Sequence, residues 1–116
     1  MTKVEIFKSK GNIQGFVVSG HSGYASEGSD IVCSAISSLS QMVCVGLENV
    51  LNLKPKLKID AKKAYLSCFL ESTDSNDLNE KAQVLFNSFE QSVNLLLAGD
   101  KKLKKYISME VKNEIY

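Results

Sequence analysis

The chain has 116 residues, of which 44% are hydrophobic and 23% are charged. This composition is typical of soluble globular proteins and argues against disordered, collagen-like and coiled-coil chains. We expect residues 1–116 to form a single domain, because this length supports one core and not two. With 14 basic and 13 acidic residues the net charge is +1, so no overall field attracts nucleic acid or an anionic membrane.

The basic residues are all lysines. A chain without arginine lacks the planar group that reads guanine or phosphate through two hydrogen bonds, which argues against sequence-specific DNA recognition. No apolar run approaches the roughly 20 residues of a membrane span, and the N-terminus lacks the pattern of a signal peptide. We therefore expect a cytoplasmic protein without membrane contact.

The chain contains three cysteines, Cys33, Cys44 and Cys68, and one histidine. An odd number of scattered cysteines predicts neither a disulfide framework nor a zinc site. No glycine-rich phosphate-binding fingerprint is present, so we expect neither a metal nor a nucleotide cofactor. Each thiol is then either a small buried hydrophobe or a reactive group.

Alternating apolar and polar residues predict strands at 3–8 and 13–19, joined by a hairpin turn. Residues 20–28 contain three glycines without a periodic pattern and predict a mobile loop. From Ser29 to Val50, apolar residues recur every three or four positions, which predicts a helix. Ser29 or Asp30 is the expected cap of this helix.

Two more strands are predicted at residues 56–60 and 64–70, and lysines on one side of the first mark it as an exposed edge strand. A second helix is expected from Ser75 or Asn76 to Gly99, followed by a strand at 107–111. The order ββαββαβ indicates an α+β fold. Two helices should pack on one or both faces of a mostly antiparallel five-stranded sheet.

His21 and Cys33 are the pair of residues that could carry chemistry. A thiol near a helix N-terminus is close to unpaired N–H groups and to the positive end of the helix dipole, which favour the thiolate. His21 could take the thiol proton, and the same N–H groups could form an oxyanion hole. Alternatively, Cys33 is a core residue next to Val32. Core packing is the better explanation for Cys44 and Cys68.

Asp30 and Ser37 could support this pair. Asp30 could cap the helix, orient the imidazole of His21, or do both. Ser37 follows Cys33 by four residues, on the same helical face, so its hydroxyl could bond the thiol, hold the loop, or bond back to the carbonyl of Cys33.

The stretch GHSGYA at residues 20–25, followed by GSDIVCSAISSL at residues 28–39, resembles the ribosomal-processing cysteine protease family, Prp. The length and the order ββαββαβ are similar along the whole chain. One position of the signature differs, because Ser34 stands where alanine is usual.

The resemblance implies a cytoplasmic cysteine protease that removes a short N-terminal extension from the bacterial large-subunit ribosomal protein twenty-seven. It implies that Cys33 is the nucleophile and His21 the general base, with Asp30 and Ser37 in supporting roles. It also implies a homodimer, no metal or cofactor, and a hydrophobic groove beside the first helix. The expected substrate loop consists of Gly20, Ser22, Gly23, Tyr24 and Gly28. We hypothesise that this loop orders over a bound peptide and only then brings His21 to Cys33.

Other classes of function remain open. The chain could be a ribosome-associated or RNA-binding module that uses its lysine-rich hairpin, with Cys33 structural. The lysines are not interleaved with aromatic residues, which argues against nucleic acid contact. A thiol redox protein is a further alternative, although no C-x-x-C motif exists to resolve an oxidised Cys33. The chain could also be a purely structural dimer.

Overall fold

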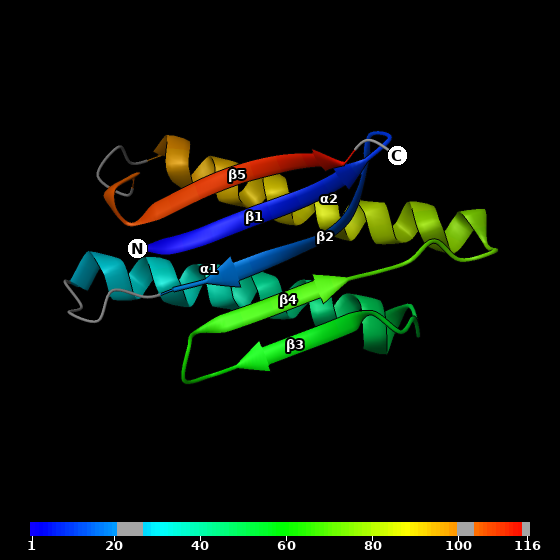
Figure 1. The fold of residues 1–116 in the computed structure, drawn as a ribbon, viewed down its shortest axis with the longest axis horizontal. Coiled ribbons are helices and arrows are strands. Elements are labelled where there is room, and N and C mark those ends of the chain that lie inside the picture. The colour runs from blue at the N-terminus through cyan, green and yellow to red at the C-terminus, as the bar shows by residue number, and fades with distance from the viewer. Residues whose placement is uncertain (21–26, 100–103, 115–116) are drawn as a thin grey trace.

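A computed structural model describes residues 1–20, 27–99 and 104–114 of the chain, with backbone alone at residues 27–30 and 114 (Figure 1). The elements are β1 (Thr2–Ser9), β2 (Asn12–Ser19), α1 (Glu27–Val45), a π-helical turn η1 (Gly46–Val50), β3 (Lys56–Asp60), β4 (Tyr65–Phe69), α2 (Asn76–Gly99) and β5 (Ile107–Glu114). This order confirms the predicted α+β fold, and η1 extends the first helix to the predicted end.

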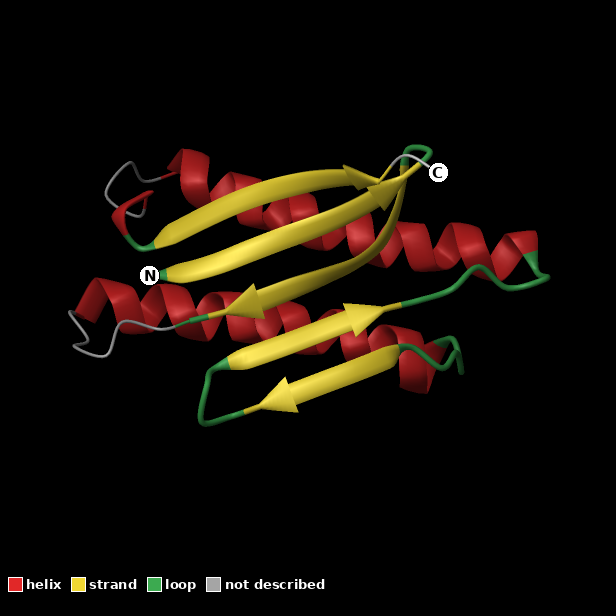
Figure 2. Cartoon of the chain, in the orientation of Figure 1, coloured by secondary structure: helices red, strands yellow, loops and turns green. Residues whose placement is uncertain are grey.

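The five strands form one sheet in the order β3-β4-β2-β1-β5. Strand β1 pairs in parallel with β5, and the other neighbours are antiparallel. Figure 2 shows that α1 and α2 both lie on the same face of the sheet, which decides between the one-face and two-face arrangements. Strand β3 lies at one edge of the sheet, as its lysines predicted.

The core lies between the sheet and the two helices. Phe16, in the central strand β2, is fully buried and stacks on Phe89 of α2, with ring centroids 4.4 Å apart. Phe86 meets the same ring edge-on at 6.2 Å. Val32, Ile36, Val43 and Leu47 of the first helix, with Val4 and Ile6 of β1, complete this layer. The apolar stripes of both helices therefore face the sheet.

The other face of the sheet carries a small aromatic cluster over Gly15. This glycine pairs with Phe7 of β1 and with Phe69 of β4, whose rings are 5.2 Å apart. A Cβ atom at position 15 would lie 2.4 Å from the Phe69 ring and from the Cys68 carbonyl oxygen. The absent side chain thus lets Phe69 lie over β2 and keeps β4 close to it.

We predict that Gly15→Ala lowers the free energy of unfolding by about 1–3 kcal/mol, because an added methyl group cannot fit without moving backbone. Urea denaturation measures this loss. Gly99→Ala is the matched control, since a Cβ there meets no atom within 4 Å. Equal stability of the two variants would contradict the packing described here.

The predicted N-terminal cap is confirmed for α2 but not for α1. The Ser75 hydroxyl accepts a hydrogen bond from the Leu78 N–H at 3.2 Å and so caps α2, as expected. In contrast, α1 begins at Glu27, so the prediction that Ser29 or Asp30 caps it is wrong. Both residues are favourable caps only where the chain enters the helix, and here the helix continues through them.

The segment Ile31–Val50 is long and apolar enough to span a membrane by length and composition alone. The prediction that no apolar run approaches the length of a membrane span is therefore wrong. Val32, Ile36, Val43 and Leu47 within this segment are buried against the sheet. The core of the fold thus accounts for these four residues, whereas Ile31, Met42, Val45 and Val50 of the same segment are exposed.

Candidate active site

A cavity of about 300 Å³ opens between the middle of α1, the end of β2 and the β3–β4 hairpin. We call it the Cys33 cavity. Its lining residues are Val18, Gly20, Cys33, Ser37, Ser40, Gln41, Ile59, Asp60, Ala61, Ala64, Tyr65 and Leu66. Positions 33, 37 and 41 are spaced by four residues, so successive turns of α1 present them to the same side. The cavity therefore lies where the resemblance placed a groove, beside the first helix.

Gly20 holds the end of β2 at the rim of this cavity. Its φ is +84°, and a Cβ there would lie 2.7 Å from the Met1 carbonyl oxygen, so the position requires glycine. Its N–H donates a hydrogen bond to the Ala64 carbonyl at 3.0 Å. This bond lies next to the β2–β4 ladder and joins the start of the predicted substrate loop to the neighbouring β3–β4 hairpin.

The three cysteines have different surroundings. Cys33 is partly exposed in the cavity, whereas Cys44 and Cys68 are buried in the core as predicted. A hydrogen bond from the Cys68 thiol to the Cys44 sulfur, together with burial, raises the pKa of Cys68. That thiol therefore remains protonated. Cys33 is the only cysteine with the access that a nucleophile needs.

Cys33 lies deeper in its helix than expected. Because α1 begins at Glu27, Cys33 belongs to the second turn and not to the first. The backbone N–H groups without a helical partner belong to the first four residues of a helix, and the dipole effect declines beyond the first turn. The prediction that these N–H groups form an oxyanion hole at Cys33 is thus not supported by this helix start.

The other predicted site residues are placed only in part. Ser37 lines the Cys33 cavity one turn after Cys33. Asp30 and Gly28 lie in the first turn of α1 by their backbone. The predictions for His21, Ser22, Gly23 and Tyr24 lie outside the described residues.

The β3–β4 hairpin contributes residues that sequence reasoning did not connect with the site. Asp60 is the only charged group among the described residues of the lining. Its Oδ1 atom accepts hydrogen bonds from the N–H groups of Lys62 and Lys63 at 3.1 and 3.2 Å, which stabilises the turn. Ile59 is 69% exposed although it is large and apolar. Its position between the charged residues Lys58 and Asp60, near the end of a predicted edge strand, was the signal that could have identified it.

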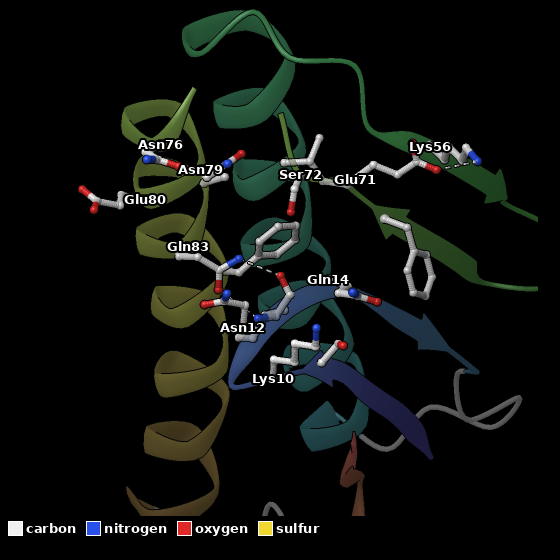
Figure 3. Close-up of a pocket in the computed structure, with 16 residues that line it drawn as sticks. Lys10, Asn12, Gln14, Lys56, Glu71, Ser72, Asn76, Asn79, Glu80 and Gln83 are labelled. Carbon is white, nitrogen blue, oxygen red and sulfur yellow. Dashed lines mark hydrogen bonds and ion pairs between the residues drawn. The ribbon is translucent and has the colours of Figure 1, made fainter. Parts of the chain in front are cut away.

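A larger cleft of about 970 Å³ lies at the opposite ends of β2 and β4, against the N-terminal half of α2 (Figure 3). Amide side chains dominate its polar lining, and Gln83 uses its amide to bond the N–H and C=O of Ile13 at 2.8 and 2.7 Å. Lys56 pairs with Glu71 at 3.6 Å. Among the predicted site residues that the structure describes, none lines this cleft, whereas Gly20, Cys33 and Ser37 line the smaller cavity, which is therefore the candidate active site. In the described part of the chain, no cluster of three or more His, Cys, Asp or Glu residues could hold a metal ion.

An accessible thiol beside a cavity is one of the features that nucleophilic catalysis by cysteine requires. A family model described as cysteine protease Prp matches residues 1–108. The chain therefore belongs to the cysteine protease Prp family, and it is a cysteine protease. A search of curated proteins gives no match.

Solved structures share this fold. SMU.848 from Streptococcus mutans is 26% identical with a TM-score of 0.82, over 98% of this chain and 96% of that chain. The ribosomal processing protease Prp from S. aureus, in complex with a substrate peptide, is 19% identical with a TM-score of 0.81, over 97% and 100%. The same S. aureus protease in complex with a covalently linked product peptide is 18% identical with a TM-score of 0.75, over 97% of this chain and 100% of that chain. At these identities the S. aureus structures establish the shared fold.

We predict that a maleimide labels Cys33 alone in the folded protein at neutral pH, because Cys44 and Cys68 are buried. Mass spectrometry counts the labels, which should rise from one to three after unfolding in denaturant. A Cys33→Ala protein should stay unlabelled while folded. Labelling of Cys44 or Cys68 at the rate of Cys33 would contradict this assignment.

Proposed function

We propose that this protease is an endopeptidase in which Cys33 is the nucleophile and His21 the general base. The observation that carries the proposal is the partly exposed Cys33 in its cavity, on a chain of the cysteine protease Prp family. Gly20 lines the same cavity, and His21 is the next residue in the sequence. This supports the pairing of a thiol from α1 with an imidazole from the loop that follows β2.

The reaction proceeds through a thioester. The Cys33 sulfur attacks the carbonyl carbon of the scissile bond, and His21 accepts the thiol proton. His21 then gives this proton to the amide nitrogen, the C–N bond breaks, and the amine product leaves. A water molecule that loses its proton to His21 attacks the thioester carbonyl carbon. The C–S bond breaks, the carboxylate product leaves, and His21 returns its proton to the sulfur.

Two further residues support the dyad in this proposal. Asp30 orients the imidazole of His21 and holds its tautomer. Ser37 is one helical turn from Cys33 and faces the same cavity, so its hydroxyl can hydrogen-bond the thiol or a residue of the loop. The loop proposed to close over the peptide contains Gly20, Ser22, Gly23 and Tyr24; the prediction that it also includes Gly28 is wrong, because Gly28 lies in the first turn of α1.

The proposed substrate is the precursor of the bacterial large-subunit ribosomal protein twenty-seven, which loses a short N-terminal extension. This proposal comes from the family resemblance, and it is supported by the fold shared with an S. aureus ribosomal processing protease that binds a substrate peptide. We further propose that residues 1–116 form one protease domain, which acts as a cytoplasmic homodimer.

The test is cleavage of a synthetic peptide that spans the extension junction, with products identified by mass spectrometry. We predict that the wild-type protein cuts at one bond and that Cys33→Ala and His21→Ala proteins do not, because each lacks one partner of the dyad. Ser34→Ala is the matched control for Cys33, since Ser34 is its exposed neighbour. This control should retain wild-type activity.

An intact peptide in the presence of folded wild-type protein would contradict the proposed function. The alternative class would then be an RNA-binding module that uses the exposed lysines of β3. RNA affinity that is the same in Cys33→Ser and wild-type proteins would support that alternative.

We predict that Ser37→Ala lowers kcat/KM by about tenfold, which is the effect of losing one hydrogen bond worth about 1.4 kcal/mol. The loss should appear mainly in kcat, because the hydroxyl acts on the thiol or the loop and not on the substrate. Ser38→Ala is the control, since Ser38 is exposed on the next position of the same helix. If the Ser37→Ala and Ser38→Ala proteins had the same kinetics, the proposed supporting role of Ser37 would be wrong.

A further inference from the structure

Strand β3 has a free edge next to the Cys33 cavity. It is the last strand of the sheet on that side, and among the described residues it pairs only with β4. Alternate residues of an edge strand direct N–H and C=O groups away from the sheet, where another extended chain can pair with them. Figure 1 shows β3 at the border of the sheet, running toward the N-terminal end of α1, which carries Cys33.

Ile59 is an apolar exception on an edge strand that is otherwise protected by lysines. Lysines normally keep such an edge from pairing with other chains, and Lys56 and Lys58 serve this purpose on one side of β3. Ile59 alternates with them and is 69% exposed. Its cross-strand partner Leu66 packs against the core, so Ile59 lies on the side of the sheet that faces the helices.

The exposed side chain of Ile59 also lines the Cys33 cavity, together with Leu66. The opposite wall is the face of α1 that carries Cys33, Ser37 and Gln41. A chain that pairs with β3 therefore passes along the mouth of this cavity. Because side chains of a strand alternate, every second side chain of that chain would point to the side of the sheet on which the cavity lies, and the one beside Ile59 would be next to the cavity.

We propose that the substrate polypeptide binds as an additional strand beside β3, with one apolar side chain packed on Ile59 and Leu66. Main-chain hydrogen bonds to β3 supply much of the affinity, and the apolar contact at Ile59 selects the sequence. The fitting substrate is an extended segment with apolar residues at alternate positions and polar residues between them, beside Lys56 and Lys58. This proposal rests on the proposed endopeptidase function and specifies how its substrate is recognised.

The first test measures binding separately from cleavage. Cys33→Ala protein is titrated with fluorescent junction peptides, each with a single N-methylated amide, and fluorescence anisotropy gives the Kd. Methylation removes one N–H donor, so we expect Kd to rise by about tenfold at every second position and to change little between them. A series without this period of two would overturn the pairing with β3.

The second test concerns specificity. Ile59→Thr keeps a β-branched residue in the strand while removing apolar contact. We expect it to raise KM by about tenfold at unchanged kcat, and so to lower kcat/KM by the same factor. Val111→Thr is the matched control, because Val111 is 42% exposed on the opposite edge strand β5. Unchanged kinetics for Ile59→Thr would overturn the role of Ile59.

The two proposals fail in different ways. If wild-type protein cleaves the peptide but the N-methyl series shows no alternation, the strand pairing is wrong and the proposed function stands. If the alternation appears with Cys33→Ala protein but wild-type protein does not cleave, the docking mode stands and the endopeptidase function falls.

Discussion

The stacking of Phe16 on Phe89 joins the central strand of the sheet to the longer helix, and the position of the site depends on it. Strand β2 has neighbours on both sides, so the burial of Phe16 between the layers determines where β1 and β4 lie. The same strand ends at Gly20, on the rim of the Cys33 cavity. Each apolar contact of this kind contributes little stability, but the sum over the core is large. The many core residues therefore fix the positions of the few residues that line the cavity.

The cavity itself is built from an α-helix wall and a hairpin wall that are far apart in sequence. Residues spaced by four along α1 form the helix wall, because they share one face. The hairpin wall is held by the backbone bond from the Gly20 N–H to the Ala64 carbonyl and by the bonds that the Asp60 side chain accepts from the turn. This division places the thiol on a helix and the proposed substrate contacts on an edge of the sheet. A catalytic thiol and its base must both be held precisely, and a helix of the scaffold is suited to hold Cys33 in this way.

Much of the fold could be predicted from local patterns. The hydrophobic stripes predicted both helices because one side of each faces the sheet, and the lysines of β3 predicted an edge. The predicted cap of the first helix was wrong, because Ser29 and Asp30 favour a cap locally but do not determine where the chain enters the helix. That start moves Cys33 to the second turn, away from the free N–H groups on which the predicted oxyanion hole depended. The exposure of Ile59 was not predicted, because alternation assigns a residue to a face without showing what covers it.

The sequence by itself determined the secondary structure order, the α+β class, the burial of Cys44 and Cys68, and Cys33 as the cysteine of interest. These properties follow from the periodicity of side chains along the chain and from a motif of neighbouring residues. Only the tertiary structure decided that both helices cover one face, that β5 joins β1 in parallel, and that Ile59 and Asp60 share a cavity with Cys33. The reason is physical: these contacts join segments that are distant in sequence, and the packing of the whole core selects them.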